Sequence, residues 1–178
     1  MRVISGTARG IKLNSIESLS TRPTLDRVKE SVFSMLYPYL RDANVLDLFA
    51  GSGSLGIEAL SRGAKKCTFV DVSRKSCACV EKNLEKTKFA DSAEVLTMSA
   101  DSFLKRSKDK FDIVLMDPPY SMGIEDSAFE NISDCIHNDT IIMLETEIKP
   151  EFYDGFEIIR QAKYGRVYIT LFKKEADI

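Results

Sequence analysis

The sequence predicts an α/β fold built around a mostly parallel sheet. After Asp42, short apolar runs rich in β-branched residues alternate with segments of helical character, the pattern of strand–helix–strand units. Only KYG, residues 163–165, separates the last two runs. Such a short connection joins antiparallel strands, because a parallel crossover needs a dozen or more residues. We therefore expect a seven-stranded, mostly parallel sheet with an antiparallel last strand.

Each strand is expected where a short apolar run is bounded by polar or turn-forming residues. The predicted strands span 44–49, 66–72, 93–98, 111–116, 140–146, 156–162 and 166–172. Helical segments lie between the first five of them, and the predicted helices span 54–62, 73–87, 100–106 and 124–135.

The segment ahead of the sheet has a different pattern. Residues 24–40 place apolar side chains at a helical period, which predicts an amphipathic helix with Thr24 as its N-cap. Residues 1–17 alternate loosely on either side of GTARG, which predicts a small β-hairpin. The sequence contains no internal repeat and no linker, so we expect one domain over 1–178. It comprises a basic hairpin extension (1–17), a helical segment (18–41) and the catalytic core (42–178).

Charge is distributed unevenly along a chain of 178 residues. Residues 1–41 carry a net charge of +4, whereas the rest carries −6, so the formal total is −2. A basic arm on an acidic body is compatible with nucleic acid as a partner. There is no long apolar stretch to cross a bilayer, so we expect a cytoplasmic protein that makes no membrane contact. We also expect a monomer, because a compact domain of this kind needs no partner to fold.

Neither the cysteines nor the histidine suggests a metal site. Cys77 and Cys79 stand in SCACV, within a predicted helix, and the four cysteines include no CxxC pair. The single histidine, His137, stands in CIHNDT and is predicted to be a turn residue. We therefore expect no metal and no disulfide.

A glycine-rich loop, DLFAGSGSLG (47–56), leaves the first strand of the predicted sheet and enters a helix. Gly51, Gly53 and Gly56 fit the GxGxxG fingerprint in its strand–turn–helix context. Asp71 follows Gly51 by 20 residues and ends the second strand, where a carboxylate can accept hydrogen bonds from ribose hydroxyls. These features fit either a nicotinamide dinucleotide or S-adenosylmethionine.

Asp47 favours S-adenosylmethionine. A carboxylate just before the glycine turn would repel a pyrophosphate but attract the ammonium and sulfonium groups of that cofactor. The alternative is that Asp47 only caps the turn. Phe49, within the loop, and Val72, beside Asp71, complete this part of the predicted cofactor site.

The third strand is expected to supply the wall that contacts adenine. It ends at TMSADSF, where an acidic or amide side chain often meets the adenine amine in this fold. Here that position holds Ser99, with Asp101 two residues later. Either Asp101 reaches the base or the backbone of Ala100 reads it, and both interpretations stay open.

The fourth predicted strand, IVLM, runs into DPPY (117–120). Ligands gather outside the carboxyl ends of parallel strands, so this tetrapeptide lies where chemistry is expected. Asp117 and the Pro118 carbonyl could each accept an N–H of an exocyclic amine and turn its lone pair towards the methyl donor. The rigid Pro118 and Pro119 would hold that geometry, and Tyr120 could stack on a base drawn out of its helix. The structural alternative is a turn that merely ends the strand.

Five segments together resemble the RsmD family of bacterial methyltransferases, which act on the 2-amino group of a guanine in small-subunit ribosomal RNA. They are MRVISGTARGIKL, TRPTLDRVKESVFSML, VLDLFAGSGSLGIEALSRGA, DIVLMDPPY and KYGRVYITLF. The resemblance covers nearly the whole chain, and RPTxDRVKE is its most specific part. It implies a Rossmann-like class I S-adenosylmethionine-dependent methyltransferase that modifies 16S rRNA, in an assembling 30S particle.

The resemblance also implies roles for individual residues. Asp47, Gly51, Gly53 and Asp71 would hold the cofactor, and 117–120 the target base. Arg22, Pro23 and Thr24 would lie near the pocket, with Arg27 and Glu30 supporting that edge, although charges on an amphipathic helix are usually only solvated. Phosphate contacts would come from basic side chains, which position an RNA without reading it: Arg2, Arg9, Lys12, Arg22 and Arg27.

Other functions remain as alternatives. An adenine-N6 methyltransferase acting on DNA or RNA would use the same four-residue loop, and a methyltransferase acting on a protein side-chain amide would more often carry Asn in place of Asp117. A nicotinamide-dependent oxidoreductase is disfavoured by Asp47 and by DPPY. An RNA-binding assembly factor without catalysis is disfavoured by the intact glycine loop and Asp117.

Overall fold

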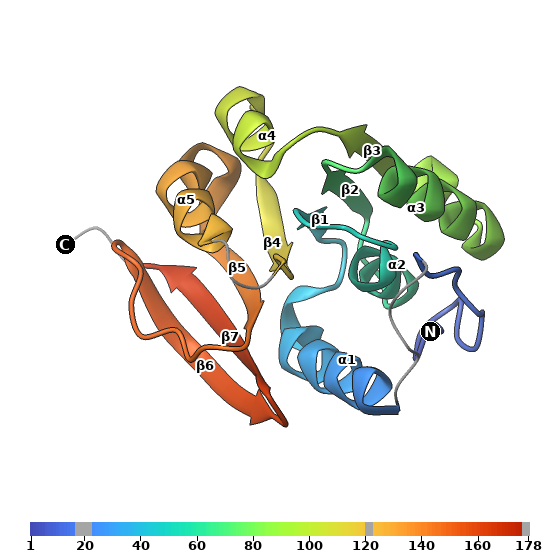
Figure 1. Cartoon of the computed structure of the whole chain (residues 1–178), viewed down its shortest axis with the longest axis horizontal. Coiled ribbons are helices and arrows are strands. Elements are labelled where there is room, and N and C mark those ends of the chain that lie inside the picture. The colour runs from blue at the N-terminus through green and yellow to red at the C-terminus, as the bar shows by residue number, and fades with distance from the viewer. Residues whose placement is uncertain (17–22, 120–122, 176–178) are drawn as a thin grey trace.

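The computed structural model describes residues 1–16, 23–119 and 123–175. Its strands are β1 (Asn44–Asp47), β2 (Lys66–Asp71), β3 (Ala93–Thr97), β4 (Phe111–Met116), β5 (Ile136–Thr146), β6 (Phe156–Tyr164) and β7 (Val167–Lys174). They form one sheet in the order β3-β2-β1-β4-β5-β7-β6 (Figure 1). The first five strands pair in parallel, and β7 runs antiparallel between β5 and β6. The predicted seven-stranded, mostly parallel α/β sheet is confirmed.

Helices cover both faces of this sheet (Figure 1). The helices are α1 (Pro23–Leu36), α2 (Ser54–Ser61), α3 (Arg74–Thr87), α4 (Ala100–Arg106) and α5 (Ile124–Asn131), with short 3-10 turns η1 (Tyr37–Tyr39), η2 (Ala90–Ser92) and η3 (Ile132–Cys135). Two apolar cores result. One packs α1, α2 and α3 against the sheet and includes Phe33 and Phe69, and the other packs α4 and α5 and includes Phe129 and Phe172.

Several element boundaries differ from the prediction for local reasons. Helix α1 starts at Pro23, so Thr24 lies in its first turn and is not the N-cap. It gives way to η1 after Leu36, because Pro38 has no N–H to continue an α-helix. Strand β5 begins at Ile136, four residues before the predicted start, so His137 is an exposed strand residue rather than a turn residue. The polar sequence after Ile136 conceals this extension, which a register shift against β4 accommodates.

The predicted amino-terminal β-hairpin is not confirmed. Only an isolated antiparallel bridge joins Arg2 to Lys12. Backbone hydrogen bonds do cross the arm, from the Val3 N–H to the Ile11 carbonyl and from the Leu13 N–H to the Met1 carbonyl, but other amides of the arm bond to α2. Those of Ile4 and Ser5 donate to the Glu58 carboxylate at 2.8 and 2.9 Å, and those of Thr7 and Ala8 donate to Ser61. The arm (residues 1–16) therefore closes on itself over a short stretch and docks on α2 through its other amides.

Glu58 is the buried anchor of that arm. Its side chain is fully buried and forms ion pairs with Arg62 at 2.8 Å and with Lys29 of α1 at 3.3 Å. Burial lowers the pKa of Lys29, although Glu58 acts in the opposite direction. Removing one member of such a buried network leaves an uncompensated charge. The network thus ties the arm, α1 and α2 together beside the glycine loop.

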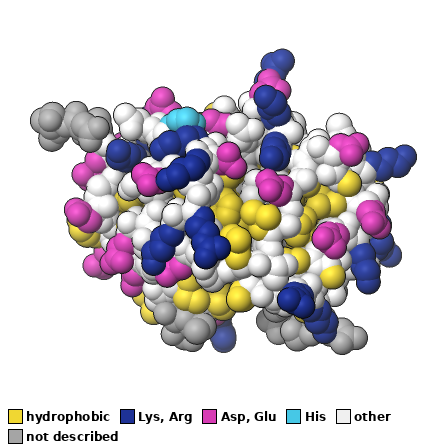
Figure 2. Space-filling model, turned by 90° about the horizontal axis from the view of Figure 1, so that it is seen from above, with side chains coloured by type: hydrophobic (Ala, Val, Ile, Leu, Met, Phe, Trp, Pro, Cys, Tyr) yellow, Lys and Arg dark blue, Asp and Glu magenta, His cyan; other side chains and the backbone are white. Residues whose placement is uncertain are grey.

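Two surface hollows differ in character. Arg2, Arg9 and Arg62, with Glu30 and others, line one of about 420 Å³ between the arm and α1. Leu96, Met98 and Phe103 contribute to another, of about 310 Å³, between β3 and α4. The face seen from above shows apolar side chains among charges of both signs (Figure 2). The hollow at the arm is lined by three arginines and one glutamate, so it is the more basic of the two.

None of the helices in the described ranges is long and apolar enough to span a membrane. Likewise, residues 1–16, 23–119 and 123–175 contain no group of three or more His, Cys, Asp or Glu side chains that could hold a metal ion. All four cysteines are buried and free.

Candidate active site

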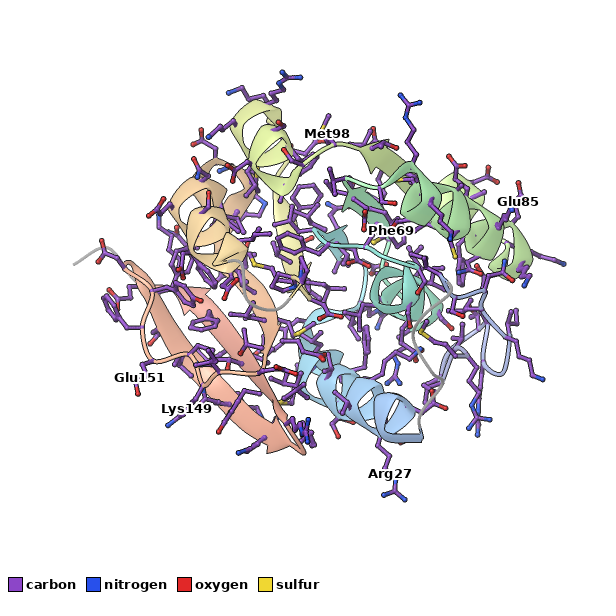
Figure 3. The ribbon with its side chains drawn as sticks, viewed as in Figure 1. Arg27, Phe69, Glu85, Met98, Lys149 and Glu151 are labelled. Carbon is purple, nitrogen blue, oxygen red and sulfur yellow. The ribbon has the colours of Figure 1, made fainter. Side chains whose placement is uncertain are left out.

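The glycine loop connects β1 to α2 in a geometry that needs glycine at two positions. Gly53 has φ +76°, the left-handed region, and is the N-cap residue of α2. A Cβ added to Gly56 would lie 2.3 Å from the ring of Phe69 and 2.7 Å from Cys67 Sγ. Figure 3 shows Phe69 beside α2. The loop is therefore held close to β2, whereas no atom lies within 4 Å of a Cβ added at Gly51, so the loop is open to a ligand there.

Asp47 lies beneath this loop rather than on its surface. Only 1% of its side chain is exposed, and Oδ2 accepts a hydrogen bond from the Gly56 N–H at 2.9 Å. Desolvation raises the pKa of Asp47 to about 7, with a smaller contribution from Asp71. Asp47 thus caps the first turn of α2, the alternative that the sequence left open. Its charge can still attract a nearby cation through the low-dielectric interior.

Asp71, at the end of β2, holds the other side of the loop. One carboxylate oxygen accepts from the Gly51 N–H and the other from the Ser73 N–H, both at 2.8 Å. Each carboxylate oxygen has a second lone pair, so a hydroxyl group could still bind. Phe49 is half-buried in the loop, and Val72 is 75% exposed beside Asp71. The predicted residues of β1 and β2 therefore surround one loop.

Asn83 is a contributor that the sequence analysis missed. It is fully buried in α3, and its side-chain oxygen accepts from the Asn14 N–H at 2.7 Å. Its amide group donates to the carbonyls of Asn14 and Ser52 at 3.0 and 2.9 Å. Asn83 therefore joins the arm to the glycine loop. Its signal in the sequence is one Asn on the apolar side of a helix, which does not reveal partners 69 and 31 residues away.

The turn after β3 carries the three candidates for the adenine wall. Ser99 is the N-cap of α4 and accepts a hydrogen bond from the Ser102 N–H, while Ala100 is buried. Asp101 accepts a hydrogen bond from Ser127 Oγ of α5 at 2.7 Å. The side chains of Ser99 and Asp101 are thus both engaged locally.

Asp117 follows β4 next to this loop. β1 and β4 are neighbouring strands, with Asp47 opposite Leu115. Asp117 is an exposed residue, but the protein around it reduces the solvation of its carboxyl group. This desolvation is the largest cause that raises the pKa of Asp117 well above the usual range, and the negative charges of Glu145 and Asp47 raise it further. Pro118 is buried and Pro119 is exposed. Tyr120 lies outside the described residues.

Glu145 is a second residue that the sequence analysis missed. It is half-buried at the carboxyl end of β5, where Leu144 pairs with Met116 of β4, so Asp117 and Glu145 follow in register. Within β5, Glu145 stands between apolar residues and Thr146, and only the pairing of the two strands brings it to Asp117.

The predicted RNA-binding residues lie on the arm and on α1. Arg2 is exposed and pairs with Asp26 at 3.2 Å, and Arg9 and Lys12 are exposed on the same arm. Arg27 is exposed and points away from the body of the molecule (Figure 3). Arg22 lies outside the described residues.

Known proteins are similar to this chain over nearly its whole length. A family model described as "Conserved hypothetical protein 95" matches residues 1–173. Ribosomal RNA small subunit methyltransferase D of Haemophilus influenzae is 41% identical, over 97% of this chain and 93% of the relative. The protein of that name from Escherichia coli is 36% identical, over 99% and 91%. The chain belongs to the RsmD family.

A solved structure supports the same membership. The Escherichia coli protein yhhF is 36% identical to this chain, with 99% of both chains covered and a TM-score of 0.88. This RsmD-family chain therefore shares its fold with that structure over nearly its whole length. The arm is part of that shared length, so it belongs to the family fold and is not an appendage of this chain.

Proposed function

We propose that this RsmD-family protein transfers a methyl group from S-adenosylmethionine to the exocyclic 2-amino group of a guanine in 16S rRNA. The observation that carries the proposal is the position of Asp117-Pro118-Pro119 after β4, next to the glycine loop of β1. The names of the relatives supply the substrate class, ribosomal RNA of the small subunit.

The residues around the glycine loop fit S-adenosylmethionine, which supplies an electrophilic methyl group on a sulfonium. Open space above Gly51 and the Asp71 carboxylate could take the amino-acid and ribose parts. Asp47 and Asp117 would attract its positive charge. The proposed cofactor site consists of Asp47, Phe49, Gly51, Gly53, Asp71, Val72, Ser99, Ala100, Asp101 and Asp117.

Asp117 and Pro118 would act by orientation. The lone pair of a guanine 2-amino group is delocalised into the ring, so the amine is a weak nucleophile. If the Asp117 carboxylate and the Pro118 carbonyl each accept one of its N–H groups, the lone pair turns towards the methyl group. Pro119 stiffens the backbone, and Tyr120 stacks on the base. The amine loses its proton to water after transfer.

The arm and α1 would bind the RNA backbone through Arg2, Arg9, Lys12, Arg22 and Arg27. Phosphates fit the basic hollow beside Arg2 and Arg9. A net charge of +4 in residues 1–41 makes a modest footprint, which loses affinity quickly with salt. We therefore propose a 30S particle as the substrate, bound by a cytoplasmic monomer.

The deciding experiment supplies labelled S-adenosylmethionine and 30S particles that lack the modification, followed by digestion to nucleosides. We expect label in N2-methylguanosine, reduced at least about 10²-fold in Asp117→Ala because the amine is no longer oriented. Label in N6-methyladenosine would replace guanine by adenine as the target. Equal activity on naked rRNA would contradict the particle as substrate.

A further inference from the structure

Glu145 lies where it can meet the same base as Asp117. The two strands that carry these residues, β4 and β5, are side by side (Figure 1). Leu115 pairs with Met143 and both belong to the core under α1, α2 and α3. Because side chains alternate along strands, Asp117 and Glu145 continue this pairing towards the same face of the sheet.

The charge of Glu145 acts on Asp117. After desolvation, Glu145 is the largest cause of the raised pKa of Asp117, ahead of Asp47. Like charges at neighbouring positions of two paired strands disfavour ionisation of both groups unless hydrogen-bond donors approach them. A ligand with two adjacent donors would therefore suit this pair, and a ligand with an adjacent acceptor would not.

Guanine has such an edge. Its 2-amino group lies beside N1–H, so two donors are adjacent, whereas adenine presents the bare lone pair of N1 beside its amine. Enzymes that act on an extruded base read this Watson–Crick edge through hydrogen bonds.

We infer that Glu145 accepts the N1–H of the target guanine while Asp117 and the Pro118 carbonyl hold its 2-amino group, which makes Glu145 a specificity-determining residue. The inference rests on the proposed function and adds the reason why guanine is chosen. A base without a proton on N1 would place its lone pair against a carboxylate, and sites built around a hydrogen bond reject such analogues strongly.

The test uses 2-aminopurine, which keeps the 2-amino group and has no proton on N1. Particles carry either guanine or 2-aminopurine at the position identified in the first experiment. We expect the wild-type protein to favour guanine by at least about 10²-fold. In Glu145→Gln, whose side-chain amide can donate to a bare N1, we expect this ratio to fall at least about tenfold.

Glu147→Gln is the matched control, because Glu147 is exposed two residues further on and the same charge is removed. Its ratio should equal that of the wild type. An unchanged ratio in a Glu145→Gln protein that still folds and binds S-adenosylmethionine would overturn the inference. So would a wild-type protein that methylates both bases equally, which keeps the test decisive if the variant does not fold.

The two proposals fail separately. If the wild-type protein labels no guanine in unsubstituted particles, the proposed function is wrong. If it labels guanine but accepts 2-aminopurine equally, only the role of Glu145 is wrong.

Discussion

The loops after β1 and β4 meet at one edge of the sheet, and they are held in opposite ways. The glycine loop is fixed from within, because Asp47, Asp71 and Asn83 all hydrogen-bond to its backbone or to the start of α2. After β4, by contrast, Asp117 is an exposed residue, although the protein around it raises the pKa of its carboxyl group. The protein therefore shapes the first loop before any ligand arrives and leaves an acceptor open at the second.

This difference predicts where substitutions act. Changes beneath the glycine loop should be measurable as lost or gained stability, because they alter buried contacts. Changes at Asp117 should be measurable as lost chemistry. Four substitutions test the contrast, in order of the effect expected on the free energy of unfolding.

The largest effect is expected from Asp47→Asn. Because the pKa of Asp47 is raised from 3.8 to about 7, the folded state binds this proton more tightly than the unfolded state does. Its contribution to stability is therefore fully present below pH 4 and is lost as the pH rises towards 7, by up to about 4 kcal/mol. The side chain of asparagine does not titrate, so the variant should lack this loss. Urea unfolding at pH 4 to 8 measures it.

The wild type and Asp47→Asn should be compared by how their unfolding free energies change with pH, and not by the values at one pH. Burying the new amide changes the unfolding free energy by the same amount at every pH. Asp91→Asn removes an exposed carboxylate and serves as the control. Parallel stability curves for wild type and Asp47→Asn would show that Asp47 has an ordinary pKa.

A smaller effect is expected from Gly56→Ala. Its new Cβ would overlap the Phe69 ring, which should cost about 3 kcal/mol. Gly51→Ala meets open space and only a left-handed φ of +53°, so it should cost about 1 kcal/mol. Denaturant unfolding gives both values. An equal loss of unfolding free energy in the two variants would show that the loop does not pack tightly against β2 at Gly56.

The smallest effect on stability is expected from Asp117→Ala. Removing this exposed side chain should change the unfolding free energy by less than about 0.5 kcal/mol at pH 4, where the raised pKa of Asp117 keeps its carboxyl group uncharged in the folded state. Calorimetry or urea unfolding of the inactive variant measures it. A loss of several kcal/mol would mean that the loop after β4 is also fixed from within, and the contrast would disappear.

Local pattern predicted the sheet well. Runs such as IVLM and IIML are apolar because both faces of a central parallel strand are buried, and the KYG connection determined the antiparallel pairing of β6 and β7. The glycine loop and DPPY were found because each is a contiguous motif. Asp47 was also found, although its burial and its bond to Gly56 appear only in the structure.

Features that depend on distant partners were not predicted. The arm docks on α2 because Glu58 and Ser61, more than fifty residues away, accept hydrogen bonds from its amides. Asn83 and Glu145 do not stand out in the sequence of their own segments. Only the packing of the fold brings Asn83 to Asn14 and Glu145 to Asp117. The sequence carries no local signal of such pairings, because the hydrogen-bond partner does not affect local propensity.

The bond between Asn83 and Asn14 also sets an order of events during synthesis. Asn14 leaves the ribosome 69 residues before its partner, so the arm has no docking site on α3 until that helix has been made. At about 5–20 residues per second, this delay is roughly 3–14 s. During that interval Asn14 lacks the partner that holds its end of the arm, close to ribosomal RNA, and the glycine loop has not yet received the side chain that holds Ser52.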